Sequence, residues 1–219
     1  MNDQHAALDW KDGAVPVSTR FDDPYFSLQG GLEETRHVFL AGNGLPARFR
    51  DGFRIAELGF GTGLNFLATA AEWIAAGSPG TLHFTSFEAF PMAPADRARA
   101  LAAFTELGAL IPVLDAALAG GAPEGIRLTV IPGDARETVP AWQGAVDAWF
   151  LDGFSPAKNP ELWEEPLLRA VAARLVPGGT LATYTAAGHV RRALSAAGLE
   201  VARVQGYGRK RHMTRAAKP

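Results

Sequence analysis

Two patterns of apolar and polar residues alternate from residue 53 to about residue 197. Short runs rich in apolar and β-branched residues predict strands at residues 53–56, 81–87, 127–131, 146–151 and 180–185. Between these runs, apolar residues that recur every three or four positions predict helices after Gly63, from Pro94, near Leu162 and from about Gly188. This alternation indicates an α/β fold with a mostly parallel, doubly wound sheet, in which ligands bind at the carboxyl ends of the strands.

The two ends of the chain depart from this alternation. Residues 199–204 and 211–216 flank the turn Gly206-Tyr207-Gly208. They must pair antiparallel, because a parallel pair needs a crossover of about a dozen residues. Residues 1–50 are irregular, with short β-like pieces around Asp12-Gly13 and a short helix at residues 33–37. We therefore expect an N-terminal elaboration over residues 1–50 that covers the active site, and one α/β domain over residues 51–219.

A glycine-rich turn follows the first predicted strand. Glu57 is followed by Gly59, Gly61 and Gly63, and a turn without Cβ atoms lets a cofactor lie against bare backbone. One residue separates the second and third glycines, whereas dinucleotide sites usually have two there, so the spacing favours S-adenosylmethionine over nicotinamide or flavin. A plain strand-to-helix connection is the alternative. The other cofactor-binding candidates in this segment are Phe60, Thr62 and Asn65.

Acidic residues also follow later strands. Glu88 ends the second strand, where a carboxylate can accept two hydrogen bonds from ribose hydroxyls, although a solvated strand-end glutamate has the same sequence signature. Asp134 follows the third strand and can accept from an exocyclic amine such as that of adenine, with the Ala135 N–H as partner for a ring nitrogen. A Gly-Asp pair is also common in turns that bind nothing.

Asp152 opens a long connection after the fourth strand. Loops of this kind, held at the edge of a rigid sheet, often carry reactive groups. A helix N-cap is the structural alternative for Asp152, but helix signals resume only near Pro160, too far along the chain for that role. We interpret Asp152 as the catalytic residue.

Composition excludes several kinds of chemistry. The 219 residues include no cysteine, which rules out disulfides, cysteine-ligated zinc, iron–sulfur clusters and a cysteine nucleophile. The histidines show no metal-ligand spacing, so we expect no metal site. No apolar stretch approaches the ~20 residues that span a bilayer, and the N-terminus lacks an apolar signal core. We therefore expect a cytoplasmic protein.

The net charge of −2 is too balanced to indicate a nucleic-acid partner, but the C-terminal segment is basic. Its cationic run could form a local phosphate-binding patch with two arginines earlier in the chain, or it could be a solvated face. The residues of this candidate patch are Arg191, Arg192, Arg209, Lys210 and Arg211.

Four segments resemble the methyltransferase domain of the MnmC family: GFGTGLNFL at residues 59–67, FLDGFSPAKNPELW at 150–163, PYFSLQGGLEETRHVFLAGN at 24–43 and GYGRKRHM at 206–213. The resemblance implies a class I, Rossmann-like methyltransferase. It also implies transfer of a methyl group from S-adenosylmethionine to the aminomethyl group of 5-aminomethyl-2-thiouridine at the tRNA wobble position, giving 5-methylaminomethyl-2-thiouridine.

The resemblance also assigns roles by position. It supports cofactor contacts at Glu57, the three glycines, Glu88 and Asp134. It also supports a catalytic-centre role for Asp152, which we expect mainly to bind and orient the amine. It implies that Tyr25, Phe26 and Glu33 are neighbours of the same pocket. For tRNA, Lys158 joins the phosphate-contact candidates named above, and Phe154 is either a stacking surface for a splayed base or a core aromatic.

The chain ends at Pro219 with no second glycine fingerprint for a flavin. We therefore expect a stand-alone, MnmD-like methyltransferase, with any earlier oxidative step performed by a separate oxidoreductase. Two alternatives remain open at this point. One is a methyltransferase that acts on another amine, in a small molecule or a protein, and the other is a non-catalytic RNA-binding subunit with the same fold.

Overall fold

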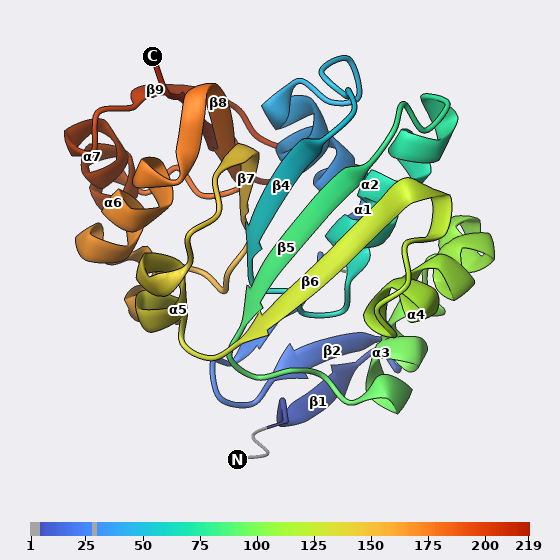
Figure 1. The fold of residues 1–219 in the computed structure, drawn as a ribbon. Coiled ribbons are helices and arrows are strands. Elements are labelled where there is room, and N and C mark those ends of the chain that lie inside the picture. Colours follow the sequence, from blue (N-terminus) through green and yellow to red (C-terminus); the bar gives the residue numbers. More distant parts are fainter. Residues whose placement is uncertain (1–4, 28–29) are drawn as a thin grey trace.

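The computed structural model describes residues 5–27 and 30–219, and its centre is a seven-stranded sheet in the order β6-β5-β4-β7-β8-β10-β9 (Figure 1). Strands β4 to β8 pair in parallel with their neighbours, and β10 runs antiparallel to both β8 and β9. The predicted parallel sheet with an antiparallel C-terminal hairpin is therefore confirmed. The strands are β4 (Phe53–Leu58), β5 (Leu82–Glu88), β6 (Ile126–Pro132), β7 (Val146–Leu151), β8 (Leu175–Thr183), β9 (Glu200–Gln205) and β10 (His212–Ala217).

The strand order brings two loops together. The chain starts at the central strand β4, moves outward through β5 and β6, and returns to β7 on the other side of β4. Leu58 at the end of β4 is in register with Leu151 at the end of β7. The turn that follows β4 and the loop that follows β7 therefore begin side by side, at the point of an open α/β sheet where ligands bind.

Helices cover both faces of this sheet (Figure 1). Helices α1 (Gly31–Thr35), α2 (Leu64–Ala75) and α4 (Ile111–Leu118) lie on one side, and α5 (Ala135–Ala141), α6 (Glu165–Ala173) and α7 (Gly188–Ala196) lie on the other. Every residue of β7 is buried, as expected for a strand packed on both faces. Phe150 of β7 joins the core under α2, whereas Trp149 joins the core under α6. Within the described residues, no helix is long and apolar enough to cross a membrane.

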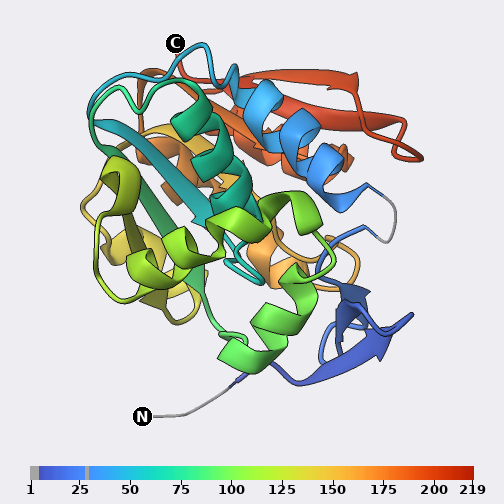
Figure 2. The same cartoon turned by 90° about the vertical axis from the view of Figure 1, so that its right-hand side faces the viewer.

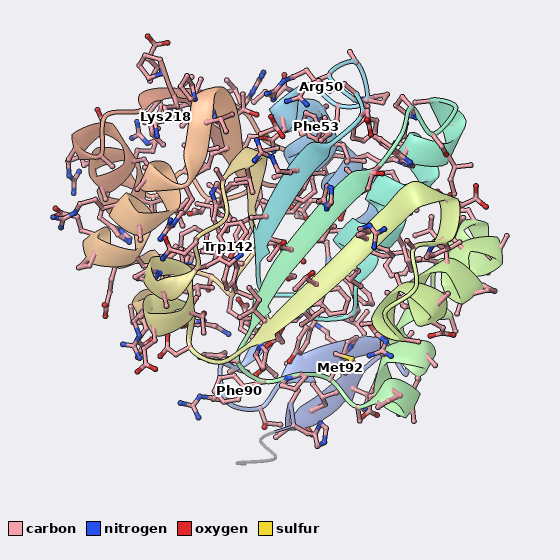
Figure 3. All side chains as sticks on the ribbon, viewed as in Figure 1. Arg50, Phe53, Phe90, Met92, Trp142 and Lys218 are labelled. Carbon is pink, nitrogen blue, oxygen red and sulfur yellow. The ribbon has the colours of Figure 1, made fainter. Side chains whose placement is uncertain are left out.

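The N-terminal segment forms a small antiparallel sheet of β1 (Leu8–Lys11), β2 (Val15–Ser18) and β3 (Asp23–Pro24). Figure 3 shows Phe90, just past the end of β5, at the end of the main sheet beside these strands, whereas Phe53 at the start of β4 marks the opposite end. The small sheet therefore stands at the carboxyl edge, where ligands are expected, and helix α3 (Pro94–Leu101) packs against β2. Helix α1 continues as a π-helical turn (Arg36–Leu40) and a 3-10 turn (Ala41–Asn43), so the helical segment is longer than predicted.

The structure differs from the sequence predictions at three places. The strand predicted at residues 180–185 begins earlier, as β8, and includes Pro177-Gly178-Gly179, because the pairing of β7 with β8 shifts register there and Gly178 adopts a positive φ of 73°. Helix α4 was not predicted, because it is only eight residues long and merges with the apolar residues before it. Helix α5 was also missed, because it follows β6 after a very short connection and contains Pro140.

Candidate active site

A cavity of about 1200 Å³ opens at the carboxyl edge of the main sheet. Its lining comes from the turn after β4, the ends of β5, β6 and β7, and the N-terminal segment. This volume exceeds that of an ordinary small-molecule pocket, so the cavity has room for two reactants. The predicted site residues among its lining are Tyr25, Phe26, Gly59, Phe60, Gly61, Thr62, Asn65, Glu88, Asp134, Ala135, Asp152, Phe154 and Lys210.

The glycine turn comes directly after β4 in the chain and lines part of the cavity. Gly59 has a φ of 85°, and a Cβ atom there would lie 2.6 Å from the main-chain oxygen of Asp152. Gly61 has a φ of 52°, and a Cβ atom there would lie 3.0 Å from Cδ1 of Tyr25. Glycine is thus required both for the backbone conformation and for the close approach of the neighbouring chain. The turn presents its backbone to the cavity, as predicted from its spacing.

Glu88 holds the glycine turn in place. Its carboxylate accepts hydrogen bonds from the Gly61 N–H at 2.9 Å and from the Phe90 N–H at 2.7 Å. Burial raises the pKa of Glu88, and these backbone donors oppose the rise. Two carboxylate oxygens have about four acceptor positions, so Glu88 keeps capacity for hydroxyl donors from a ligand in the cavity.

Asp134 is the N-cap of α5. Its side chain accepts from the Arg136 N–H at 2.9 Å and from Nη2 of Arg136 at 2.6 Å. Hydrogen bonds from Arg136 lower the pKa of Asp134, so this carboxylate is ionised at neutral pH. Arg136 also lines the cavity, although the sequence analysis did not select it. The sequence signal that could have indicated Arg136 is its position two residues after Asp134, an acidic residue suited to an N-cap.

Asn65 joins two buried carboxylates. Its Nδ2 donates to Oε1 of Glu57 at 2.8 Å and to Oδ2 of Asp152 at 2.7 Å, and its Oδ1 accepts from Oγ1 of Thr35 at 2.9 Å. Glu57 is 1% exposed, does not line the cavity, and accepts from Oγ of Ser86 at 2.6 Å. Contrary to the predicted direct cofactor contact, the structure places Glu57 behind the cavity wall, where it supports Asn65. Gly63 is likewise outside the lining, at the N-terminus of α2.

The surroundings of Asp152 bring its pKa near neutrality. Burial is the main cause that raises this pKa, to about 7 in all; the nearby Glu34 carboxylate acts in the same direction, and the hydrogen bond from Asn65 and the charge of Lys210 oppose the rise. A carboxyl group with this pKa is about half ionised at pH 7. It can therefore orient a bound nitrogen as a carboxylate and also accept a proton from it.

Three aromatic rings form part of the cavity wall. The Phe154 ring lies 4.9 Å from the Phe21 ring and 5.0 Å from the Tyr25 ring, measured between centroids, and all three residues line the cavity. The backbone of this loop is tied to β3 by the bond from Ser155 N–H to Asp23 at 2.8 Å. Phe154 is therefore a wall residue rather than part of the main core, and stacking with a base remains a prediction.

The remaining candidates lie outside the cavity lining. Glu33 is exposed and faces a second, smaller hollow, whereas its neighbour Glu34 is buried on the other side of α1 and lines the cavity. Lys158 pairs with Asp22 at 2.8 Å. The predicted phosphate contacts outside the lining are Arg191, Arg192, Arg209 and Arg211.

Lys210 lies in the cavity lining, where its Nζ is 2.6 Å from Oε1 of Glu34. Sequence reasoning missed Glu34, Thr35 and Tyr184, which also line the cavity. Glu34 and Thr35 lie on the buried face of α1, and an assignment of that face from the sequence could have indicated them. Within the described residues, no cluster of three potential metal ligands is present.

Known proteins share both the sequence and the fold. Residues 115–219 match a family model described as S-adenosyl-L-methionine-dependent methyltransferase. The chain is 46% identical over 230 residues to a protein of Aeromonas salmonicida named tRNA 5-methylaminomethyl-2-thiouridine biosynthesis bifunctional protein MnmC, in an alignment that covers 94% of this chain and 34% of that protein. A protein of the same name from Caulobacter vibrioides is 47% identical over 225 residues, covering 97% of this chain and 38% of the relative.

The chain thus spans about a third of the length of the curated relatives that it matches. Among solved structures, MNMC2 from Aquifex aeolicus is 27% identical to this chain and superimposes with a TM-score of 0.75. That match covers 99% of this chain and 72% of the other.

Proposed function

Because residues 115–219 match a family of S-adenosyl-L-methionine-dependent methyltransferases and nearly the whole chain is 46–47% identical to the matched region of the MnmC proteins, we propose that it methylates the aminomethyl group of 5-aminomethyl-2-thiouridine in tRNA. The product is 5-methylaminomethyl-2-thiouridine, the nucleoside in the names of its relatives. The family resemblance inferred from the sequence motifs is confirmed by these comparisons.

The observation that best supports an amine acceptor is the position of Asp152. It follows β7 directly, its main chain touches the glycine turn at Gly59, and its carboxylate lines the cavity. S-Adenosylmethionine supplies a methyl group on a positively charged sulfur. A carboxylate beside the glycine turn would hold a nitrogen nucleophile within reach of that methyl group.

The residues present fit the cofactor. Glu88 has free acceptor capacity for ribose hydroxyls, and the Ala135 N–H and the Asp134 carboxylate at the end of β6 would meet an adenine. The backbone of residues 59–62 would lie along the rest of the ligand. The cavity therefore separates a donor half, near Glu88 and Asp134, from an acceptor half near Asp152.

An alkyl amine presents a problem of protonation that Asp152 can address. With a pKa of about 10, only about one amine molecule in a thousand is neutral at pH 7. A buried site disfavours the ammonium form, and ionised Asp152 can accept the proton that nitrogen must lose. Positioning of the nitrogen by the same carboxylate lowers the barrier further.

The acceptor half suits a nucleotide. Phe21, Tyr25 and Phe154 offer aromatic surface to a splayed base, and Arg209 and Arg211 are exposed on the β9–β10 turn for contact with phosphates. We propose a cytoplasmic location for this reaction, because that is where a bacterial tRNA substrate would be found. We further propose that a separate oxidoreductase acts earlier on the same nucleoside where no fused oxidase is present.

Nucleoside mass spectrometry tests the proposal. Transfer RNA from bacteria that lack this modification is incubated with the protein and S-adenosylmethionine, and we expect conversion of the aminomethyl nucleoside to its methylated form. Methylation of small amines or proteins without any change in tRNA would reject tRNA as the substrate. An Asp152→Asn variant should bind the cofactor normally in calorimetry and lose conversion, whereas a non-catalytic RNA-binding protein would show no conversion in either form.

A further inference from the structure

A closed ring of contacts surrounds the acceptor half of the cavity. Starting at Asp152, it runs through Asn65 at 2.7 Å and then through Thr35 at 2.9 Å from Asn65. Thr35 is followed by its chain neighbour Glu34, whose Oε1 lies 2.6 Å from Nζ of Lys210. The ring therefore links the carboxyl end of β7 to helices α2 and α1 and to the turn between β9 and β10.

Tyr184 completes the ring. The Lys210 ammonium lies 4.2 Å from the centroid of the Tyr184 ring, and the Tyr184 hydroxyl donates to the main-chain oxygen of Gly153 at 2.7 Å. Gly153 follows Asp152 in the chain. Every member of this ring lines the same cavity. Figure 2 shows the β9–β10 hairpin, drawn in red, extending beside the blue helical segment that begins with α1. Lys210 lies in the turn of this hairpin.

The pair of Glu34 and Lys210 is built into the wall rather than left on the surface. The Glu34 side chain is 11% exposed and also accepts a hydrogen bond from the Ser27 hydroxyl. Lys210 is 43% exposed, with its ammonium held between a carboxylate and an aromatic face. Because both charged groups line the cavity, this geometry points to a role in the site.

We propose that Glu34 and Lys210 are positioning residues of the acceptor site whose opposite charges act in opposite directions on Asp152: Lys210 favours its carboxylate form, and Glu34 opposes this. The inference rests on the proposed methyl transfer to an amine. A cation at this position has a second effect, because it disfavours a charged ammonium in the same space. Lys210 would thus favour the neutral amine while also favouring the charged form of its proton acceptor.

The charges around Asp152 act in opposite directions. Glu34 from α1 and Glu57 from β4 are acidic, Asn65 from α2 donates a hydrogen bond, and Lys210 from the hairpin is cationic. Tyr184 after β8 and Asp23 of β3 also lie near the loop, and Lys158 of the loop pairs with Asp22. Because Glu34 and Lys210 have opposite charges, removing each one should move the titration of Asp152 in an opposite direction, which a general loss of structure would not do.

The test is an NMR titration of the full-length protein labelled with carbon-13 at aspartate carboxyl groups, with the Asp152 signal assigned by Asp152→Asn. It needs neither tRNA nor cofactor, so its outcome is independent of whether tRNA is methylated. Lys210→Met should move the Asp152 titration midpoint upward by about 0.5 pH unit or more, and Glu34→Gln should move it downward by a similar amount.

Three further variants serve as controls for the titration. Lys210→Arg keeps the charge and should keep the midpoint near that of the wild type, and the double variant Glu34→Gln with Lys210→Met should fall between the two single variants. Arg203→Met removes an equal charge from an exposed position on β9 and should leave the midpoint unchanged. Midpoints that stay constant, or that move in the same direction in both single variants, would overturn the proposal.

Discussion

Gly59 packs directly against the main-chain carbonyl of Asp152, so that a Cβ atom at position 59 would lie only 2.6 Å from that oxygen. Two loops that follow neighbouring parallel strands are thereby held at a fixed distance. The cofactor turn and the proposed catalytic carboxylate cannot move independently of each other.

Gly59→Ala should therefore impair binding and catalysis together. The added methyl group has to displace either the turn or Asp152, and its φ of 85° disfavours alanine in any case. We expect at least a tenfold weaker cofactor Kd in calorimetry and a loss of about 1–3 kcal/mol in the free energy of unfolding. The matched control is Gly52→Ala, which has a φ of 69° but no atom within 4 Å, and should cost stability without weakening the cofactor.

The pH dependence of tRNA methylation should report the ionisation of Asp152. Since burial raises the pKa of Asp152 to about 7, kcat/KM should rise with pH through about 7 and fall tenfold per pH unit well below it. Asp152→Asn should lower kcat by about 10²–10⁴-fold and abolish this acidic limb. A wild-type profile that stays flat between pH 5 and 8 would contradict the assignment of Asp152 as proton acceptor.

The same carboxyl group should destabilise the folded protein at alkaline pH. Its pKa is higher in the folded protein than the ordinary value of 3.8, so the folded state binds more protons than the unfolded chain between about pH 4 and pH 7. Stability from this group is thus lost as pH rises through that window. Asp152→Asn should raise the free energy of unfolding on the order of 1–2 kcal/mol at pH 8 and leave it nearly unchanged at pH 4, as measured by urea unfolding.

Glu88→Gln should weaken the cofactor selectively. The amide has one acceptor atom where the carboxylate has two, so it cannot accept from the N–H groups of Gly61 and Phe90 while also accepting from a ligand. We expect a 10–100-fold weaker Kd for S-adenosylmethionine and a kcat within a few-fold of the wild type at saturating cofactor. Glu200→Gln, at an exposed position on β9, is the control and should leave both quantities unchanged.

Arginines on the β9–β10 turn should contribute to tRNA affinity through charge. Arg209→Ala combined with Arg211→Ala removes two exposed cations beside the cavity. We expect weaker tRNA binding and a log–log salt slope shallower by about 1.5, with unchanged cofactor affinity. Arg127→Ala, an exposed residue on β6, provides the comparison, and an unaltered slope in the double variant would locate the RNA surface elsewhere.

The sequence predicted those features that short segments encode. The strands, the glycine turn and the carboxylates at strand ends follow from local apolar patterns and from the fact that parallel strands end at one edge. Asp152 was selected because its loop is too long for an N-cap role, and the structure places it in the cavity wall. Local pattern was therefore enough to define the donor half of the site.

The acceptor half depends on contacts that no local pattern contains. Lys210 and Glu34 form an ion pair although they lie near opposite ends of the sequence. Tyr184 contacts Gly153 only because β8 lies beside β7. Glu57 illustrates the reverse case: an acidic residue directly before a glycine turn suggests a ligand contact, but in the structure it accepts from Ser86 and Asn65 behind the wall. Burial of a strand-end side chain depends on the neighbouring strand and helix, which the sequence of its own segment does not specify.

The antiparallel course of β10 has a consequence for engineering. Because β9 runs parallel to β4–β8, the turn from β9 into β10 lies at the same edge of the sheet as the ends of β4, β5 and β7. This turn provides Lys210, the most C-terminal residue of the cavity lining. The residues proposed to hold the methyl donor, by contrast, lie between residues 59 and 135. Grafting a different turn between these two strands offers a way to retarget the enzyme to new amines without rebuilding the part that recognises the donor.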